Sequence, residues 1–225
     1  MHLIRRSLLF SVLLTATWGG GLAVASAPAF AAGLTASHIG LSTTTPSIAF
    51  GQSALLRAQV KPLTGTGAPT GTVTFAEGTT TLATGALATI NGAQLARVSI
   101  NGLTVGTHTI TATYSGDTTY AASTSKPVTV VVAKAATTTK ILANKTTKPG
   151  KYNLTTIVTF KTAPAPTGTV QYTIDGAAPI TVTLQSTARA HLITTFIVGT
   201  SHTVTVNYSG DANYLASTAS ITFTA

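Results

Sequence analysis

The sequence predicts an all-β protein made of two tandem β-sandwiches, and three observations support this prediction. Threonine supplies 46 residues after position 31, about a quarter of that part of the chain, and β-branched side chains favour strands. Residues 107–114 alternate between threonine and mostly apolar residues, which is the period of a strand. The segment Tyr114–Thr124 returns 94 positions later as Tyr208–Thr218, with eight of eleven residues identical. A long match at a fixed offset indicates a repeated structural unit.

The N-terminus has the pattern of an export signal. Two arginines precede an apolar run over residues 8–24, and the small residues of Ala29-Phe30-Ala31 follow. We therefore predict a signal peptide over residues 1–31, cleaved after Ala31. Two alternatives stay open. One is an uncleaved membrane anchor, which the three glycines at 19–21 disfavour because they weaken the apolar run. The other is a twin-arginine signal.

The remaining 194 residues are enough for two domains of about 100 residues each. They contain no cysteine, so the exported chain must rely on hydrophobic cores rather than disulfides. Each half would bury roughly 60–70% of its unfolded surface, which suffices without cross-links. No second apolar run long enough to span a membrane follows. We therefore expect a product outside the cytoplasm without a transmembrane span after cleavage.

The first domain is predicted over residues 35–132. Asn91-Gly92 predicts a hairpin, and the Gly- and Pro-rich residues 65–69 predict a loop. Apolar and polar residues alternate in the segments that we interpret as strands, at residues 53–60, 70–75, 96–100, 107–114 and 128–132.

A linker is predicted over residues 133–136 and the second domain over residues 137–225. Thr137-Thr138-Thr139 repeats three threonines that lie 94 positions earlier, whereas Pro166–Val170 repeats Pro69–Val73 at an offset of 97. The offset then returns to 94, so the middle of the second copy has lost about three residues.

One segment of the second copy has two possible registers. Either Ala188, Ala190 and Leu192 face the core, or Arg189 and the residues alternating with it do. We favour the first register because the second would turn Arg189 inward.

About seven short strands in about 95 residues is the pattern of an immunoglobulin-like β-sandwich. In the first copy, Pro-Thr-Gly-Thr-Val-Thr-Phe over 69–75 and Val-Gly-Thr-His-Thr-Ile-Thr-Ala-Thr-Tyr-Ser-Gly-Asp over 105–117 resemble the bacterial Ig-like repeat family of exported and surface proteins. The resemblance covers both copies. The second departs from the pattern at residues 199–202, which are one residue longer than 106–108. The resemblance implies a spacer or adhesive module and implies no single ligand.

Two histidines occupy equivalent positions in the copies. His108 lies two residues before Ile110, and His202 two residues before Val204. In the immunoglobulin fold, this place belongs to a corner tyrosine that hydrogen-bonds back to the chain, and we interpret each histidine as such a corner residue. A metal ligand is the alternative, but a metal site needs several ligands, and none lies near in sequence.

The repeated loop motif contains glycine, aspartate and two tyrosines in each copy. Asp117 and Asp211 are candidates for calcium ligands, but such sites gather several carboxylates and each loop offers one. We interpret both as residues of Asx-type turns and the tyrosines as core and loop anchors. The motif residues predicted to be structural are Tyr114, Gly116, Asp117 and Tyr120, and Tyr208, Gly210, Asp211 and Tyr214.

The inventory of reactive residues disfavours an enzyme. The whole chain has four acidic residues, whereas glycoside hydrolysis needs two carboxylates facing one cleft, and Glu77 and Asp175 stand alone in predicted turns. No nucleophile elbow or phosphate-binding loop occurs. The single tryptophan, Trp18, lies in the predicted signal, so a sugar-binding plate is unsupported. We predict no catalysis, no cofactor and no bound metal.

Charge is the one asymmetry that suggests a binding role. After residue 31, eleven Lys and Arg face four acids, and no acid occurs between Asp117 and Asp175. We hypothesise that this basic region contacts anionic envelope polymers or a membrane surface by non-specific electrostatics. A solvated lysine face that guards edge strands is the alternative, and nucleic acid is disfavoured because no aromatic residues accompany the lysines. The residues concerned are Lys126, Lys134, Lys140, Lys145, Lys148, Lys151 and Lys161.

These features together predict an exported, non-catalytic repeat protein, extracellular or associated with the cell envelope. We expect a structural, spacer or adhesive role at the cell surface, with a surface protein or polysaccharide as partner. The alternative is a secreted module that binds envelope polysaccharide or another anionic polymer through residues 126–161.

Overall fold

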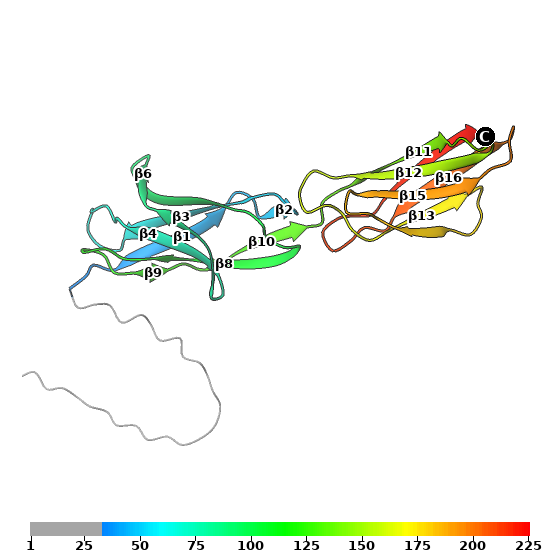
Figure 1. The fold of residues 1–225 in the computed structure, drawn as a ribbon. Helices are drawn as coiled ribbons and strands as arrows, with labels where there is room; N and C mark the ends of the chain where they lie inside the picture. Colours follow the sequence, from blue (N-terminus) through cyan, green and yellow to red (C-terminus); the bar gives the residue numbers. More distant parts are fainter. Residues whose placement is uncertain (1–32) are drawn as a thin grey trace, which may run out of the picture.

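The computed structural model of the chain describes residues 33–225, and the export signal predicted over 1–31 lies outside the described residues. The described part contains strands and no helix. The strands fall into two groups that lie end to end (Figure 1), domain 1 with β1–β10 and domain 2 with β11–β17. Each domain consists of two facing sheets. The prediction of two tandem β-sandwiches is confirmed.

Domain 1 pairs its strands in the orders β1-β3-β7-β6 and β2-β10-β8-β4-β5, and β9 adds to the far end of β8. The chain changes sheet between β1 and β2, because β1 pairs with β3 whereas β2 runs parallel to β10. The strands of domain 1 are β1 (Ser37–Thr43), β2 (Ser47–Ala49), β3 (Ala54–Pro62), β4 (Thr72–Glu77), β5 (Thr80–Ala86), β6 (Ala88–Ile90), β7 (Ala93–Ile100), β8 (Gly106–Tyr114), β9 (Ser123–Thr124) and β10 (Val128–Ala133).

Domain 2 has the orders β11-β12-β15 and β14-β13-β16-β17. Its first strand stays in one sheet and pairs with β12 along its whole length. The strands of domain 2 are β11 (Thr138–Lys145), β12 (Lys151–Thr159), β13 (Thr169–Ile174), β14 (Ile180–Thr183), β15 (Arg189–Thr195), β16 (Ser201–Tyr208) and β17 (Ser217–Thr224).

Each domain has its own hydrophobic core between its two sheets. In domain 1 the alternating side chains of β8 that point inward, from His108 to Tyr114, are buried. In domain 2 the same face of β16 is buried from His202 to Tyr208. Burial of such apolar side chains is the main stabilising term for domains without disulfides.

Several local predictions are confirmed by the structure. Asn91 and Gly92 both have positive φ and form the turn between β6 and β7, as a two-residue hairpin requires. Ala188 and Ala190 are buried and Arg189 is exposed, so the favoured register is right. The two short strands β2 and β9 were not predicted, because segments of two or three residues carry no readable alternation.

Candidate functional site

In domain 1, Asp117 of the motif Tyr-Ser-Gly-Asp is hydrogen-bonded to the motif Pro-Thr-Gly-Thr. Oδ1 of Asp117 accepts hydrogen bonds from the amides of Thr119 at 2.8 Å and Tyr120 at 2.7 Å. Oδ2 accepts from the amide of Thr70 at 2.8 Å and from its hydroxyl at 3.0 Å. Partial burial opposes ionisation, but these donors outweigh it and hold the pKa of Asp117 far below its ordinary value of 3.8. The hydroxyl of Tyr114 also donates to the Thr70 carbonyl at 2.6 Å.

Domain 2 repeats this arrangement bond for bond. Asp211 accepts from the amides of Asn213 and Tyr214, both at 2.8 Å, and from the amide and hydroxyl of Thr167 at 2.7 and 3.0 Å. The hydroxyl of Tyr208 donates to the Thr167 carbonyl at 2.8 Å. Both carboxylate oxygens already have two donors in each domain, so the geometry is that of a closing turn rather than of an open cation site.

The glycine of each motif allows the loop to close. Gly116 and Gly210 have φ of 76° and 73°, a region that favours glycine. A Cβ would lie 2.9 Å from the Ala122 nitrogen at Gly116 and 2.8 Å from the Tyr214 oxygen at Gly210. The motif Tyr-Ser-Gly-Asp therefore supplies a buried tyrosine, a residue with positive φ and a carboxylate to one compact crossing.

The corner histidine of domain 1 bridges a carboxylate and a backbone carbonyl. Nδ1 of His108 lies 2.9 Å from Oε2 of Glu77, and Nε2 lies 2.9 Å from the Thr104 carbonyl. With an acceptor at each nitrogen, the ring is best satisfied as the doubly protonated imidazolium. The hydrogen bond that His108 donates to Glu77 therefore raises the pKa of His108 above 6.5, and the same bond lowers the pKa of Glu77 below 4.5.

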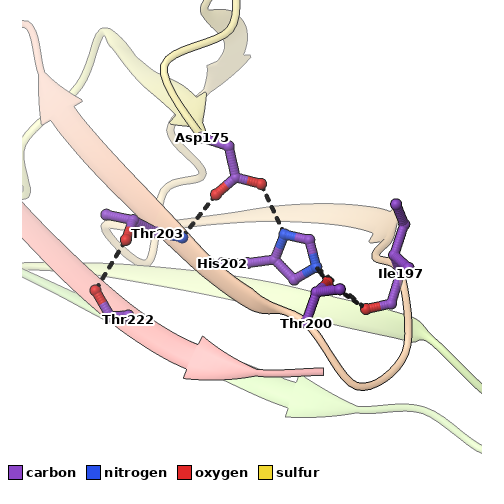
Figure 2. Close-up of polar contacts among 6 residues, drawn as sticks. All are labelled: Asp175, Ile197, Thr200, His202, Thr203 and Thr222. Carbon is purple, nitrogen blue, oxygen red and sulfur yellow. Dashed lines mark hydrogen bonds and ion pairs between the residues drawn. The ribbon is translucent and has the colours of Figure 1, made fainter.

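Figure 2 shows the equivalent histidine of domain 2 between Asp175 and Ile197. Nδ1 of His202 lies 2.7 Å from Oδ2 of Asp175, and Nε2 lies 3.2 Å from the Ile197 carbonyl and 2.6 Å from the Thr200 hydroxyl. The other oxygen of Asp175 accepts from the Thr203 amide at 2.7 Å. The bond to Asp175 raises the pKa of His202, and the bond to His202 lowers the pKa of Asp175.

Sequence reasoning left Glu77 and Asp175 unpartnered, whereas the structure places each acid against a corner histidine. The partners lie 31 and 27 residues apart in sequence and meet because β4 and β13 pair with β8 and β16. A signal was available. An acid follows the proline of Pro-Thr-Gly-Thr by eight residues in the first copy and by nine in the second.

The two domains are joined by an aromatic contact. The ring of Phe50, in the turn after β2, packs against the cores of both domains and lies edge-on to Tyr214 with centroids 5.8 Å apart. The carbonyl of Phe50 accepts a hydrogen bond from the Thr162 hydroxyl at 3.3 Å. A Cβ at Gly51 would lie 2.4 Å from Cβ of Thr162, so only glycine fits this approach.

The linker adds polar contacts to this junction. The amide of Ala135 donates to the Asn213 carbonyl at 2.8 Å, and the Leu215 amide donates to the Ala135 carbonyl at 2.9 Å. The ammonium group of Lys134 donates to the Asp211 carbonyl at 2.5 Å. The repeated loop of domain 2 is thus the surface on which the linker lies.

The seven lysines of the predicted basic region do not form one cluster. All are exposed except Lys151, which is half-buried. The ion pairs in residues 33–225 involve the two histidines and no lysine, because the four acids are engaged by histidines or turns. The lysines divide into Lys126 after β9, Lys134 and Lys161 at the two chain segments of the junction, Lys140 within β11, and Lys145, Lys148 and Lys151 around one cavity of about 180 Å³.

Two larger hollows lie on domain 1. One of about 480 Å³ adjoins the hairpin at residues 91–94, and one of about 530 Å³ lies on β3 and β7 beside Arg57 and Arg97. Neither is lined by an acid or a histidine. Over residues 33–225, no group of three or more His, Cys, Asp or Glu side chains could hold a metal ion. The same stretch includes no helix with the length and apolar character needed to cross a membrane.

Comparison with known families gives two matches along the chain. The model of the bacterial Ig-like domain, group 3, matches residues 41–133 and again residues 138–225. The two matches correspond to the two sandwiches. No curated protein matches the sequence.

Similar solved structures include the fibronectin(III)-like modules of CbhA from Clostridium thermocellum, with 15% identity, a TM-score of 0.30 and coverage of 81% of this chain and 92% of that one. The adhesin InvE of Yersinia pseudotuberculosis has 15% identity, a TM-score of 0.37 and coverage of 83% and 58%. A tetra-tandem repeat from the extending region of a large adhesion protein has 20% identity, a TM-score of 0.42 and coverage of 84% and 49%. The chain spans about half of that last structure.

Proposed function

The chain belongs to the bacterial Ig-like domain family, and on this basis we propose that it is a non-catalytic module of the cell surface with a spacer or adhesive role. The observation that carries the proposal is the junction. Phe50 packs against both cores, and the linker is hydrogen-bonded to domain 2 through both the amide and the carbonyl of Ala135. Such a junction holds two sandwiches end to end, which is what a spacer requires.

The engagement of the acidic side chains supports a role without catalysis. Asp117 and Asp211 accept hydrogen bonds from backbone amides through both oxygens. Glu77 and Asp175 are bound to histidines at the domain ends. General acid–base chemistry needs a carboxylate or histidine that reaches a substrate, and these groups are directed into turns and strand ends instead.

The test of the surface role is exposure on intact cells. The full chain, with a C-terminal tag, is expressed in a bacterium of the kind that carries such repeats, and whole cells are treated with a protease that does not cross membranes. The proposal predicts that the protease removes the tag from intact cells. In untreated cells, the tagged protein should be found in the envelope or medium fraction. A tag that stays protected and sediments with no envelope fraction would contradict it.

We propose as a second function the contact with anionic polymers through residues 126–161. The specific observation is that the seven lysines have no carboxylate partner among the described residues. Their positive charge is therefore not neutralised within the protein and is available to a polyanion. Because they spread from Lys126 of domain 1 through the linker and along domain 2, a long polymer fits this distribution better than a compact ligand.

The salt dependence of binding tests this second function. Binding of the full chain to a soluble polyanion is measured from about 50 to about 200 mM salt, and electrostatic contacts must weaken steeply over that range. Indifference to salt, or no binding at the lowest salt, would exclude the contact. The test is independent of the surface location, so either proposal can fail alone.

A further inference from the structure

Three lysines at the end of domain 2 that lies away from domain 1 line one cavity. Lys145 ends β11, Lys148 lies in the hairpin and Lys151 begins β12. They share a cavity of about 180 Å³ with Tyr152 and Val198. Cavities for whole organic ligands are larger, from about 300 Å³ upward, so this volume suits one small group.

The hairpin that carries the lysines has a fixed conformation. The amide and hydroxyl of Thr146 both donate to the Lys151 carbonyl at 2.9 Å, and the Lys151 amide donates to the Lys148 carbonyl at 3.1 Å. The Phe196 amide donates to the carbonyl of Gly150 at 2.8 Å, which attaches the hairpin to the end of β15. Three like charges are thus held near one another by bonds of the backbone.

Tyr152 provides an independent observation that points to a ligand. Its side chain is 3% exposed and lines the same cavity, but its hydroxyl oxygen has no hydrogen-bond partner within residues 33–225. Buried hydroxyl groups normally have a partner, and leaving one without is costly. The ammonium group of Lys145 lies 5.9 Å from the centroid of the Tyr152 ring, so the cation is a neighbour of the residue that carries this buried hydroxyl.

We propose that Lys145, Lys148, Lys151 and the Tyr152 hydroxyl form a site for one phosphate group, either free or as part of an anionic polymer. Phosphate offers several acceptor oxygens, which three ammonium groups and a phenol can share. The exposed side chain of Val198 lines the cavity and provides an apolar rim along which the rest of a polymer extends. For a polymer, this inference rests on the second proposed function and gives it a defined contact point.

The first experiment compares two triple variants with equal charge change. Lys145→Gln/Lys148→Gln/Lys151→Gln removes the site, and Lys126→Gln/Lys140→Gln/Lys161→Gln is the control, because those side chains are exposed and lie outside the cavity. Binding of the full chain to inorganic phosphate, poly(glycerol phosphate) and polygalacturonate is measured by calorimetry. We expect the site variant to lose at least about tenfold in affinity for both phosphate probes, as the loss of charge-assisted bonds implies, and the control to lose clearly less.

The possible outcomes distinguish failure of the phosphate site from failure of the second proposed function. Equal losses in both triple variants would overturn the site while leaving the non-specific polymer contact in place. Binding of inorganic phosphate without either polymer would support the site and contradict the second proposed function. Preference for polygalacturonate over both phosphate probes would exclude phosphate as the ligand.

Tyr152→Phe separates binding from a structural role. The change removes only the unpartnered hydroxyl, so we expect the free energy of unfolding without phosphate to stay equal or rise. Affinity for inorganic phosphate should fall several-fold, and the stabilisation of the protein by phosphate should shrink in parallel. A loss of stability without phosphate, with affinity unchanged, would show that the hydroxyl has no part in the site.

Discussion

The two domains close their ends in the same way but use their first strand differently. In both, the aspartate of Tyr-Ser-Gly-Asp accepts two hydrogen bonds from a threonine of Pro-Thr-Gly-Thr and two from amides of its own loop. In domain 1 the first strand then crosses to the other sheet as β2 and pairs with β10, whereas β11 of domain 2 stays beside β12. The closure of the loop is thus the same in both domains, whereas the strand at the edge of the sheet differs.

Pro46 marks the point where the first strand of domain 1 leaves the β1–β3 ladder. Pro46 lies between β1 and β2, whereas the equivalent place in domain 2, by the bridges of Thr35 to Tyr120 and of Ala135 to Tyr214, falls at the hairpin after β11. Thr44 donates to Leu55 across the β1–β3 ladder, so residue 46 would be the next donor in an antiparallel alternation. Proline has no amide hydrogen and cannot continue the ladder. In domain 2, β11 ends at Lys145 and the hairpin leads directly to β12.

The consequence is an open strand in domain 2. β10 of domain 1 has β2 on its outer edge, and the Val131 amide donates to the Pro46 carbonyl at 2.9 Å. Among the described strands, β17 pairs with β16 alone. Its inward residues Ile221 and Phe223 stay half-buried, whereas Val130 is fully buried. A strand that crosses over therefore protects both an edge and a core.

Among the variants that test this difference between the domains, Lys140→Pro should have the largest effect on stability. Proline would remove a ladder bond inside β11, so domain 2 should lose about 3 kcal/mol or more of its free energy of unfolding, while domain 1 is unchanged. Lys140→Ala is the control and should stay within about 0.5 kcal/mol. Denaturant unfolding followed by a probe in each domain measures both. A loss shared equally by the two domains would contradict the assignment to one ladder.

Asp117→Asn and Asp211→Asn test whether the loop closure is the same in both domains. Each change leaves an amide where Oδ2 accepted two hydrogen bonds from threonine, and removes charge assistance, so each domain should lose about 2 kcal/mol. The prediction is equality between the two variants, measured by the unfolding of the domain that carries the change. A loss confined to one domain would mean that the equivalent contacts differ in strength.

Hydrogen exchange should detect the open edge without any mutation. By register, Thr222 and Thr224 of β17 occupy the places of Thr129 and Val131 of β10. Their amides alternate with those bonded to β16 and point to the free edge. We expect the Thr224 amide to exchange at least about tenfold faster than the Val131 amide, since local protection follows the bond to a neighbour. Equal protection at low protein concentration would show that another segment covers β17.

The smallest expected effect is the pH dependence of the corner histidines. Because Glu77 and Asp175 raise the pKa of His108 and His202 above 6.5, this stabilisation is complete below pH 6.5 and is lost as pH rises through the folded values. The pKa values of the acids are lowered from 4.5 and 3.8, so their stabilisation is lost as pH falls through the folded values. Denaturation midpoints of both domains should therefore be highest between about pH 4.5 and 6.5. His108→Gln and His202→Gln should flatten the alkaline side of their own domain only, and an unchanged profile would refute the pairing.

The fold and its repeated motifs were predictable, since period-two alternation and the match between residues 114–124 and 208–218 depend on local sequence. The histidine–carboxylate pairs were not, because strand pairing brings together residues 27 and 31 positions apart. In the sequence, the seven lysines form one region. In the structure, three of them surround a cavity at the hairpin of residues 146–150, apart from the other four. Pro46 could be recognised in the sequence as a residue that interrupts strands. Its effect on the first strand became clear only from the pairing of β1 with β3.

The most direct test of the spacer account is the distance between the two domains in solution. The chain has no cysteine, so Thr107→Cys and Gln171→Cys, both at exposed strand positions, allow one spin label in each domain. Pulsed electron resonance on the labelled chain should give a single narrow distance distribution, and Phe50→Ala should broaden it by removing the shared aromatic contact. A distribution in the unaltered junction as broad as that of the Phe50→Ala variant would contradict the claim that the junction fixes the two domains end to end.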